Sequence, residues 1–536
     1  MSPPHPLALS TATLITPLGA LSGVLMLLLA APVGGFALAA GLRLIGWRWT
    51  WAAVAAPLAW PLGSLSGVWQ LTMLLACGQA IRLGRRWQRS DTDLGGDLAQ
   101  GARAAFGPTD LVRRIRGAWE IRRERWVDRR GLLIGTDARG LGVRIPLGGD
   151  SGSHTLVVGA SGTGKTVTQI SRVVRAVEHG HGAIVCDPKG DCDLENALRR
   201  VAREQGRRML VWTPEGKDTY NPYGYGSDSE IADKALAVER YTEPHYLRQA
   251  QRYLGHAVRT MRLTGVPVSP ASLVRYLDPL QLEVLARRIA DEEQARTVWR
   301  YLDSLSARQL RDLGGTRDRL AILPESDIGR WLDPEAPGAE TFDLLQAMRW
   351  RAVVYFRLDA DRRPLLAQML AGALVGDVLA AAAALQATPI PTTVMIDEFS
   401  AIAADQVAGL FARSRAAGIS LLLGTQELSD LRRPGSDALR DQVLGNVETL
   451  IAHRQVVPAS AQLVCDVAGG RGAWAGSERT HPGWASLLGA TGGSRSRVRE
   501  PLILPDQVRT LPTGVAAVVV PGARRAPRVA RILRAG

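Results

Sequence analysis

Cysteine and lysine are both scarce in this chain. Its 536 residues include four cysteines, Cys77, Cys186, Cys192 and Cys465, with no CxxC pair and no spacing typical of zinc ligands. Neither a disulfide framework nor a metal-stapled fold is therefore indicated. Lysine also occurs four times, among 65 basic residues, so arginine is the ordinary cation of the chain. A high arginine count is then partly compositional background and does not by itself predict nucleic-acid binding.

Extremes of composition are absent as well. Hydrophobic residues make up 46%, charged residues 22% and aromatic residues 5% of the chain. This composition excludes wholesale disorder, and the length predicts about three structural units. The net charge of +14 is unevenly placed, because residues 1–130 and residues 471–536 each carry a net +8. Only the two ends of the sequence are strongly basic.

Two long stretches contain no charged side chain. Neither Met1–Leu42 nor Trp49–Ile81 includes an Asp, Glu, Lys or Arg, and each exceeds the roughly 20 apolar residues that cross a bilayer. We expect spans at about 18–42 and 53–81, which form an N-terminal transmembrane helical hairpin. More arginines follow the second stretch than lie in the short connection. The positive-inside rule then predicts a multi-pass protein of the cytoplasmic (inner) membrane, with everything after residue 82 in the cytoplasm.

Other interpretations of these stretches were weighed. A cleaved signal peptide is disfavoured, since no Lys or Arg precedes the first apolar run. Buried core helices of a soluble chain, or four shorter spans with the same topology, are the alternatives to the hairpin.

A glycine-rich loop follows a short apolar run. Thr155–Val158 reads as a buried strand, and apolar residues after Thr166 recur at helical spacing. The pattern GxxxxGK[ST] between a strand and a helix predicts a phosphate-binding loop, the Walker A motif. Its residues are Gly159, Ala160, Ser161, Gly162, Thr163, Gly164, Lys165 and Thr166.

This loop predicts ATP and Mg²⁺ as ligands. Its backbone N–H groups would converge on the β-phosphate, and the helix N-terminus adds positive potential. Lys165 would bridge the β- and γ-phosphates, and the Thr166 hydroxyl would ligate Mg²⁺. The alternative, a chance glycine-rich turn, is disfavoured by the presence of a lysine in a chain that otherwise uses arginine.

An acid pair ends a second apolar strand. Thr393–Ile396 delivers Asp397 and Glu398 at a strand's carboxyl end, where parallel sheets bind ligands. Asp397 is expected to hold Mg²⁺ as the Walker B aspartate, and Glu398 to orient and polarise the attacking water. Alone, such a strand end could simply be solvated. With an intact phosphate loop upstream, it predicts catalysis.

Polar residues flank the next expected strand, Ile419–Leu423. Gln426 follows it, one strand–helix unit after Asp397, which suits a sensor of the γ-phosphate. Arg413 and Arg415 precede the strand, and either could reach a neighbouring subunit's nucleotide as an arginine finger. An ordinary surface arginine is the alternative for each.

The remaining pattern predicts the domain organisation. Between 228 and 345 it turns helical with proline-marked breaks, which indicates an inserted all-helical domain. Residues 469–497, rich in Gly and Ser, read as a flexible insertion. Two edge strands are expected at 514–520 and 529–533. The expected parts are 1–90 (hairpin and basic juxtamembrane segment), 91–227 (first part of the motor domain), 228–345 (helical domain) and 346–536 (second part, with Walker B and the C-terminal edge strands).

The order of these motifs resembles the TraG/TraD family of type IV coupling proteins, the membrane ATPases of conjugation and type IV secretion. The resemblance covers most of the chain, from the apolar hairpin to the stretch 446–454. Its most specific segments are DPKGD at residues 187–191 and GTQELSDL at residues 424–431. Further matching segments are YNP at 220–222, YTEPHY at 241–246, MIDEF at 395–399, ARSRAAGIS at 412–420 and the stretch 446–454.

The resemblance implies an α/β fold: a RecA-like P-loop NTPase motor domain that forms a homo-hexameric ring under the membrane. Such rings hydrolyse ATP and move a DNA–relaxase substrate, with single-stranded DNA bound independently of sequence, towards the channel of the type IV secretion system. By the same resemblance, Arg415 is the preferred finger in trans and the helical domain faces the substrate. A helical packing lobe without a substrate role is the alternative for that domain.

Three other functions were weighed. The same motor could export proteins only, and nothing in the sequence separates the two cargoes. An FtsK-like chromosome pump would need a C-terminal DNA-reading domain, for which little chain follows Asp397. A catalytically silent membrane scaffold is disfavoured by the intact Lys165, Glu398 and Gln426.

Overall fold

A twelve-stranded sheet organises the larger part of the chain. The computed structural model describes residues 17–45, 50–54, 67–93, 108–128, 131–138, 140–237, 243–402, 404–432, 436–478, 493–521 and 526–535. The chain divides into two compact units, each described by itself: Met1–Trp119 with Gly470–Glu500, and Glu120–Gly469 with Pro501–Gly536. The four-part division expected from the sequence stays a prediction.

The centre of the sheet is parallel. Its seven neighbouring strands are, in order, β12 (Thr449–Ala452), β4 (Thr155–Val158), β11 (Ile419–Thr425), β10 (Thr392–Ile396), β5 (Gly182–Asp187), β9 (Val353–Arg357) and β6 (Met209–Trp212). All but one of these neighbouring pairs join strands that are not consecutive in the chain (the exception is β10 with β11), and the parallel pairing requires the connections to cross over the sheet. The strand of the phosphate loop therefore lies next to β11 and one strand away from β10.

An antiparallel extension continues the sheet beyond β12. It contains β15 (Val515–Val519), β16 (Arg528–Ile532), β2 (Gly131–Asp137), β3 (Gly142–Ile145) and β1 (Val127–Asp128). The prediction that the two C-terminal strands are edges is wrong, because β15 lies between β12 and β16, and β16 lies between β15 and β2. The strand β2, which the sequence analysis did not identify, pairs with β16 and makes it internal.

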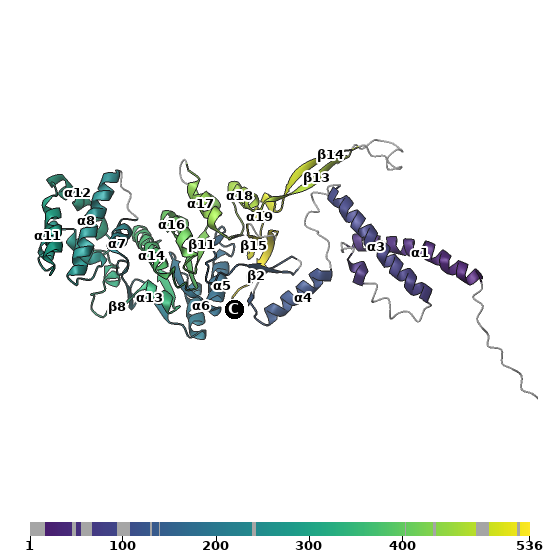
Figure 1. The fold of residues 1–536 in the computed structure, drawn as a ribbon, viewed down its shortest axis with the longest axis horizontal. Coiled ribbons are helices and arrows are strands. Elements are labelled where there is room, and N and C mark those ends of the chain that lie inside the picture. The colour runs from purple at the N-terminus through teal and green to yellow at the C-terminus, as the bar shows by residue number, and fades with distance from the viewer. Residues whose placement is uncertain are drawn as a thin grey trace, which may run out of the picture. The chain divides into compact units, whose positions relative to one another are not determined.

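Helices cover both faces of the sheet (Figure 1). On one face lie α5 (Lys165–Glu178) and α6 (Cys192–Glu204), and on the other α14 (Pro364–Leu385), α16 (Ala404–Ser414) and α18 (Pro458–Ala468). Successive strand residues alternate between the two cores: Val394 and Ile396 join one, and Met395 joins the other. Burial on both faces explains why these strands are continuous apolar runs. The prediction of an α/β fold is confirmed.

Six helices separate the first strands from β9. They are α7 (Asp228–Leu236), α8 (Pro244–Leu263), α9 (Pro270–Tyr276), α10 (Pro279–Ala286), α11 (Glu292–Asp303) and α12 (Ala307–Ala321). They share a hydrophobic cluster of their own, and α8 contacts α7, α10 and α12 (Figure 1). The range expected to be all-helical also contains β8 (Glu340–Phe342), which pairs with β7 (Asp218–Tyr220). That the helices form a separate inserted domain stays a prediction.

Short elements complete this unit. They are η2 (Gly329–Leu332), α13 (Leu344–Arg349), α15 (Phe399–Ile402), η3 (Leu428–Leu431), α17 (Ala438–Asn446) and α19 (Pro505–Arg509).

The other unit holds the N-terminal helices. These are α1 (Pro17–Leu44) and α3 (Gly67–Asp93), which pack on each other through Ala39, Leu42 and Ala80; α4 (Pro108–Arg122) follows. The unit also contains the two-stranded sheet of β13 (Gly470–Glu478) and β14 (Gly493–Pro501). Within the expected flexible insertion at 469–497, residues 470–478 and 493–497 are strand, and residues 479–492 lie outside the described part.

Among the described residues, one helix is long and apolar enough to cross a membrane. It is α14, and 72% of its apolar window is buried in the core. A core helix meets these criteria of length and composition as readily as a span does, so it gives no support for a multi-pass topology. The first expected span coincides with α1; of the second, residues 67–81 lie in α3 and 55–66 lie outside the described residues. The hairpin stays a prediction.

A buried ion pair joins the helices to the sheet domain. Lys234 on α7 donates to Asp377 Oδ1 on α14 over 3.1 Å and to the carbonyls of Pro222 and Tyr225. The Tyr220 hydroxyl donates to Asp377 Oδ2 over 2.9 Å. Burial raises the pKa of Asp377 to about 6, against the effect of Lys234. Because these groups are buried, their hydrogen bonds are made within the protein and not to water.

Replacing Lys234 by Met should destabilise the protein. The change leaves a carboxylate buried without its cation, which typically costs about 3–5 kcal/mol. We expect the free energy of unfolding in urea to fall by about 3 kcal/mol. The matched control is Arg262→Met, which removes an exposed pair with Asp228 between α8 and α7 and should cost less than about 1 kcal/mol. Equal losses in the two variants would contradict this assignment.

Candidate functional site

Four strands of the parallel sheet have their carboxyl ends side by side, and we call this side of the sheet the carboxyl edge. In the ladder register, Ile396 at the end of β10 lies opposite Leu423 of β11 and Cys186 of β5. On β4, Val158 lies opposite Thr425. The segments that follow these strands therefore emerge side by side, where open parallel sheets bind their ligands.

The phosphate-binding loop runs from the end of β4 to the start of α5. Gly164 has φ +105°, a left-handed conformation that glycine adopts readily, and α5 begins at Lys165. Two contacts fasten the loop: Ala160 N donates to the carbonyl of Arg454 over 3.2 Å, and Gly514 N donates to that of Thr163 over 2.9 Å. The helix N-terminus, with its unpaired N–H groups, is thus held beside the acid pair.

Lys165 lies between the two predicted acids. Its Nζ donates to Glu398 Oε1 over 2.6 Å and lies 3.3 Å from Asp397 Oδ1. All three residues are at most 8% exposed. Burial opposes ionisation of Glu398, but Lys165 and then Lys189 outweigh it and lower its pKa below the usual value. The glycine-rich loop and the acid pair therefore form one composite site.

Neighbouring amides hold the acids in place. Gln169 Nε2 donates to Asp397 Oδ1 over 3.0 Å, and Gln426 Nε2 donates to Glu398 Oε1 over 3.3 Å. Glu398 has φ +46°, a left-handed conformation rare for a residue with a side chain. Such backbone strain persists only where the surroundings enforce it, and it is concentrated at functional sites.

The DPKGD segment reaches the same site from the end of β5. Asp187 accepts hydrogen bonds from the backbone N–H groups of Lys189, Gly190 and Asp191 and from the Tyr355 hydroxyl. This turn directs Lys189 to Glu398 Oε1, with Nζ at 3.0 Å. The sequence analysis assigned no role to Asp187 or Lys189. The scarcity of lysine and the match of DPKGD to the family resemblance were the available signals.

The buried side chain of His453 lies against the phosphate loop. His453 Nε2 lies 2.8 Å from the Thr168 hydroxyl, and an added Cβ on Gly159 would come within 2.7 Å of the His453 Cβ. Burial lowers the pKa of His453 to about 4, and the ring is therefore neutral near pH 7. Sequence reasoning missed this residue and Gln169, because neither belongs to a short motif.

The structure does not bring every predicted residue to the carboxyl edge of the sheet. Arg415 precedes β11 and so lies at the amino end of the strand, opposite to Gln426. Its guanidinium donates to the Asn446 carbonyl over 2.8 Å and lies 3.3 Å from Glu448 Oε1. Within one chain it is thus remote from Lys165, and its predicted role in trans stays a prediction. Thr166 lies in the first turn of α5, next to Lys165.

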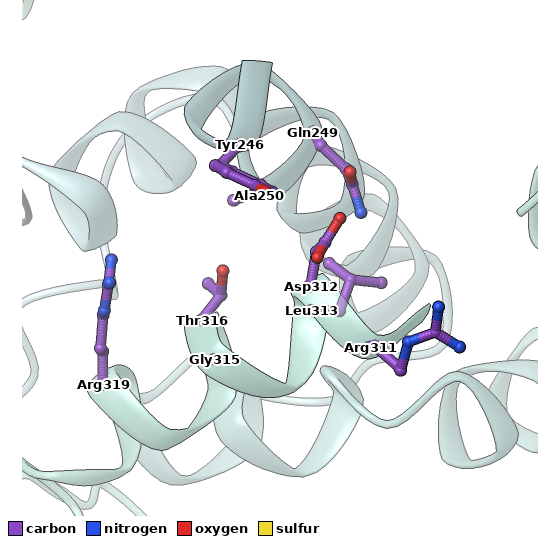
Figure 2. A pocket seen from close by; sticks show the side chains of 9 residues that line it. All are labelled: Tyr246, Gln249, Ala250, Arg311, Asp312, Leu313, Gly315, Thr316 and Arg319. Atoms are coloured by element: carbon purple, nitrogen blue, oxygen red, sulfur yellow. The ribbon is translucent and has the colours of Figure 1, made fainter. Parts of the chain in front are cut away.

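A second feature is a cavity of about 290 Å³ between α8 and α12. Figure 2 shows the Thr316 hydroxyl pointing towards Tyr246, with Arg311 and Arg319 flanking the opening. It is lined by Tyr246, Gln249, Ala250, Arg311, Asp312, Leu313, Gly315, Thr316 and Arg319. The lining combines an aromatic ring, two cations and several hydrogen-bonding groups.

Comparison with known proteins bears on the family that the sequence resembles. Residues 391–513 match the family model described as the TraM recognition site of TraD and TraG, and this range includes Asp397, Glu398 and Gln426. The chain is also 30% identical over 104 residues to the type 4 coupling protein DotL of Legionella pneumophila subsp. pneumophila. That alignment spans 17% of this chain and only 13% of DotL. The resemblance to the TraG/TraD type IV coupling proteins is confirmed.

Solved structures share the fold. The bacterial conjugative coupling protein TrwB, in an unbound form, aligns with a TM-score of 0.54 at 17% identity, covering 77% of this chain and 91% of TrwB. TrwB in complex with ADP and Mg²⁺ aligns with a TM-score of 0.54 at 18% identity, covering 77% and 92%. Identities this low establish the fold alone.

Changing Gly424 to Ala should weaken binding of Mg²⁺·ATP, if the acid pair holds the metal as the sequence predicts. An added Cβ would overlap both Asp397 Oδ1 and Gln169 Nε2, so the aspartate must move. We expect at least about a tenfold rise in Kd by calorimetry, equivalent to about 1.4 kcal/mol. The control is Gly409→Ala in α16, where nothing lies within 4 Å of the added Cβ. Equal affinities for the two variants would refute this role of Asp397.

Proposed function

We propose that this protein is a membrane-anchored, ATP-driven translocase that couples a DNA–relaxase substrate to a type IV secretion channel. The observation that carries the proposal is that Lys165 Nζ lies within 3.3 Å of both Asp397 Oδ1 and Glu398 Oε1. The lysine and the acids come from segments 233 residues apart in the sequence. A buried lysine between two carboxylates suits a site that exchanges internal ion pairs for phosphates and a metal.

The residues present fit a nucleotide with its magnesium ion. Residues 159–166 would cradle the phosphates with backbone N–H groups, and Lys165 would turn from the acids to the β- and γ-phosphates. Thr166 and Asp397 would hold Mg²⁺, whose positive charge would replace that of Lys165 beside Asp397. When bound, Mg²⁺ neutralises charge on the phosphates. The TrwB structures with ADP and Mg²⁺ and with an ATP analogue support this assignment.

The chain's own groups then perform the hydrolysis. Glu398 would accept a hydrogen bond from the attacking water and orient it towards the γ-phosphate. Gln426, which already donates to Glu398, would sense the presence of the γ-phosphate. Because Arg415 lies at the opposite edge of the sheet, it can act only on a neighbour's nucleotide, which accords with the proposed homo-hexameric ring.

Cargo contact is proposed for the helical part and the basic ends. The lining of the cavity includes Tyr246, Arg311 and Arg319, with Asp312 beside them, and aromatic rings near arginines are a combination that binds single-stranded nucleic acid without sequence preference. The net charge of +8 at each end of the sequence adds attraction for phosphates. Location at the cytoplasmic membrane and attachment to a secretion channel follow from the coupling-protein resemblance.

Lys165→Ala should abolish ATP hydrolysis. Removing the cation that contacts the γ-phosphate deprives the developing charge of its main protein partner, which typically lowers kcat about 100- to 1,000-fold. Phosphate release is the measurement, and Lys217→Ala, which changes an exposed lysine, is the control. Undiminished turnover in Lys165→Ala would refute the site.

Single-stranded DNA should bind with strong dependence on salt. Each neutralised phosphate contributes a slope of about −0.7 to log K against log[salt] for single strands. We expect affinity for a fluorescent oligonucleotide to fall steeply between about 50 and 200 mM salt. Absence of binding, or binding indifferent to salt, would contradict DNA as cargo and favour export of proteins only.

A further inference from the structure

Lys189 contacts the same carboxylate oxygen as the phosphate-loop lysine. Glu398 Oε1 accepts from three donors: Lys165 over 2.6 Å, Lys189 over 3.0 Å and Gln426 over 3.3 Å. The two lysines approach from different strands, β4 and β5, on either side of β10 in the order of the sheet. Glu398 thus has two cationic partners, and only one of them belongs to the phosphate loop.

Hydrogen bonds within the DPKGD turn fix the backbone position of Lys189. Asp187 accepts three backbone N–H groups of the DPKGD segment, at 2.6–3.0 Å, and is itself fixed by the Tyr355 hydroxyl at 2.8 Å. Both Asp187 and Tyr355 are buried. The Lys189 side chain, in contrast, is 50% exposed and reaches the acid from the rim of the site. A fixed backbone with an exposed stem suits a cation that stays in place while the centre of the site rearranges.

Binding of a nucleotide changes the partners of the acid pair. Under the proposed function, Lys165 moves to the phosphates, and its 2.6 Å contact with Glu398 is lost. Glu398 is only 7% exposed, and without another cation the neutral Gln426 amide would be the remaining donor to its Oε1 among the three described here. A buried carboxylate that loses its cation is strongly destabilised unless a second charge remains close. Within the described residues around Glu398, Lys189 supplies that charge.

We propose that Lys189 is a positioning residue that holds Glu398 towards the attacking water after Lys165 has moved to the nucleotide. This inference rests on the proposed ATP hydrolysis and assigns a role to the DPKGD segment. Lys189 acts through Glu398 and does not contact the phosphates. Its loss should therefore affect turnover and leave nucleotide binding in place.

The test measures kcat, KM and the Kd for ATP in the full-length protein carrying Lys189→Met. Met has a similar length and apolar volume but no charge. We expect kcat to fall about 10- to 100-fold, since a misplaced water-orienting group costs about this much. The Kd for ATP should change less than about threefold, well under the 1.4 kcal/mol of a tenfold change. The melting temperature should stay close to that of the wild type, because the side chain is half exposed and Lys165 still pairs with Glu398 in the absence of nucleotide.

Two further variants sharpen the result. Lys189→Arg keeps a cation that can donate to Glu398 and should restore most of the lost kcat, which a purely structural role would not predict. Lys217→Met changes an exposed lysine outside the site and should leave all three constants unaltered.

Several outcomes would overturn the inference. Wild-type kcat in Lys189→Met would show that Glu398 needs no second cation. A higher KM and Kd with unaltered kcat would make Lys189 a phosphate contact instead. If Lys165→Ala retained full turnover, or the wild type hydrolysed no ATP, the proposed function itself would fail, and the role of Lys189 with it. An active wild type together with a Lys189→Met variant of undiminished kcat refutes the role of Lys189 alone.

Discussion

The ammonium group of Lys165 lies between two buried carboxylates, and the rest of the site is arranged around that contact. A phosphate loop needs its lysine directed at the ligand, and an acid pair this deeply buried needs a cation. One ion pair meets both needs when no nucleotide is bound. The amides of Gln169 and Gln426 and the ammonium of Lys189 complete the coordination of the two carboxylates. One cation can thus replace another while each buried carboxylate keeps a partner.

The sheet makes this contact possible. Because the strand order places β4 beside β11, and β10 between β11 and β5, loops separated by more than 200 residues emerge at one edge. Helices on both faces bury the strands completely and fix their register, since a slip by one residue would turn every side chain to the opposite core. On the other side of α14, the Lys234–Asp377 pair ties the helices α7–α12 to the helix that leads into β10.

The motif-bearing elements could be predicted from the sequence, and several of the others could not. The strand before Gly159, the helix after Thr166 and the strand before Asp397 were predicted to within a residue or two, because burial on both faces leaves a plain apolar run. The prediction that the two C-terminal strands are edge strands of the sheet failed for a physical reason. β2 is a glycine-containing strand without clear alternation, so β16 was taken for an edge. The paired strands β13 and β14 lie in a Gly- and Ser-rich stretch, where composition indicates a loop although backbone pairing needs no particular side chain.

The sequence by itself determined the chemistry of the site: a glycine cradle with its lysine, an acid pair and a glutamine, each at the end of an apolar strand. These signals are local, since a loop and the strand before it are encoded within about a dozen residues. Only the tertiary structure decided that Lys189, Gln169 and His453 lie beside them, and that Arg415 lies at the far edge of its own strand. Contacts of this kind depend on strand order and on packing between distant segments, and neither leaves a periodic pattern along the chain.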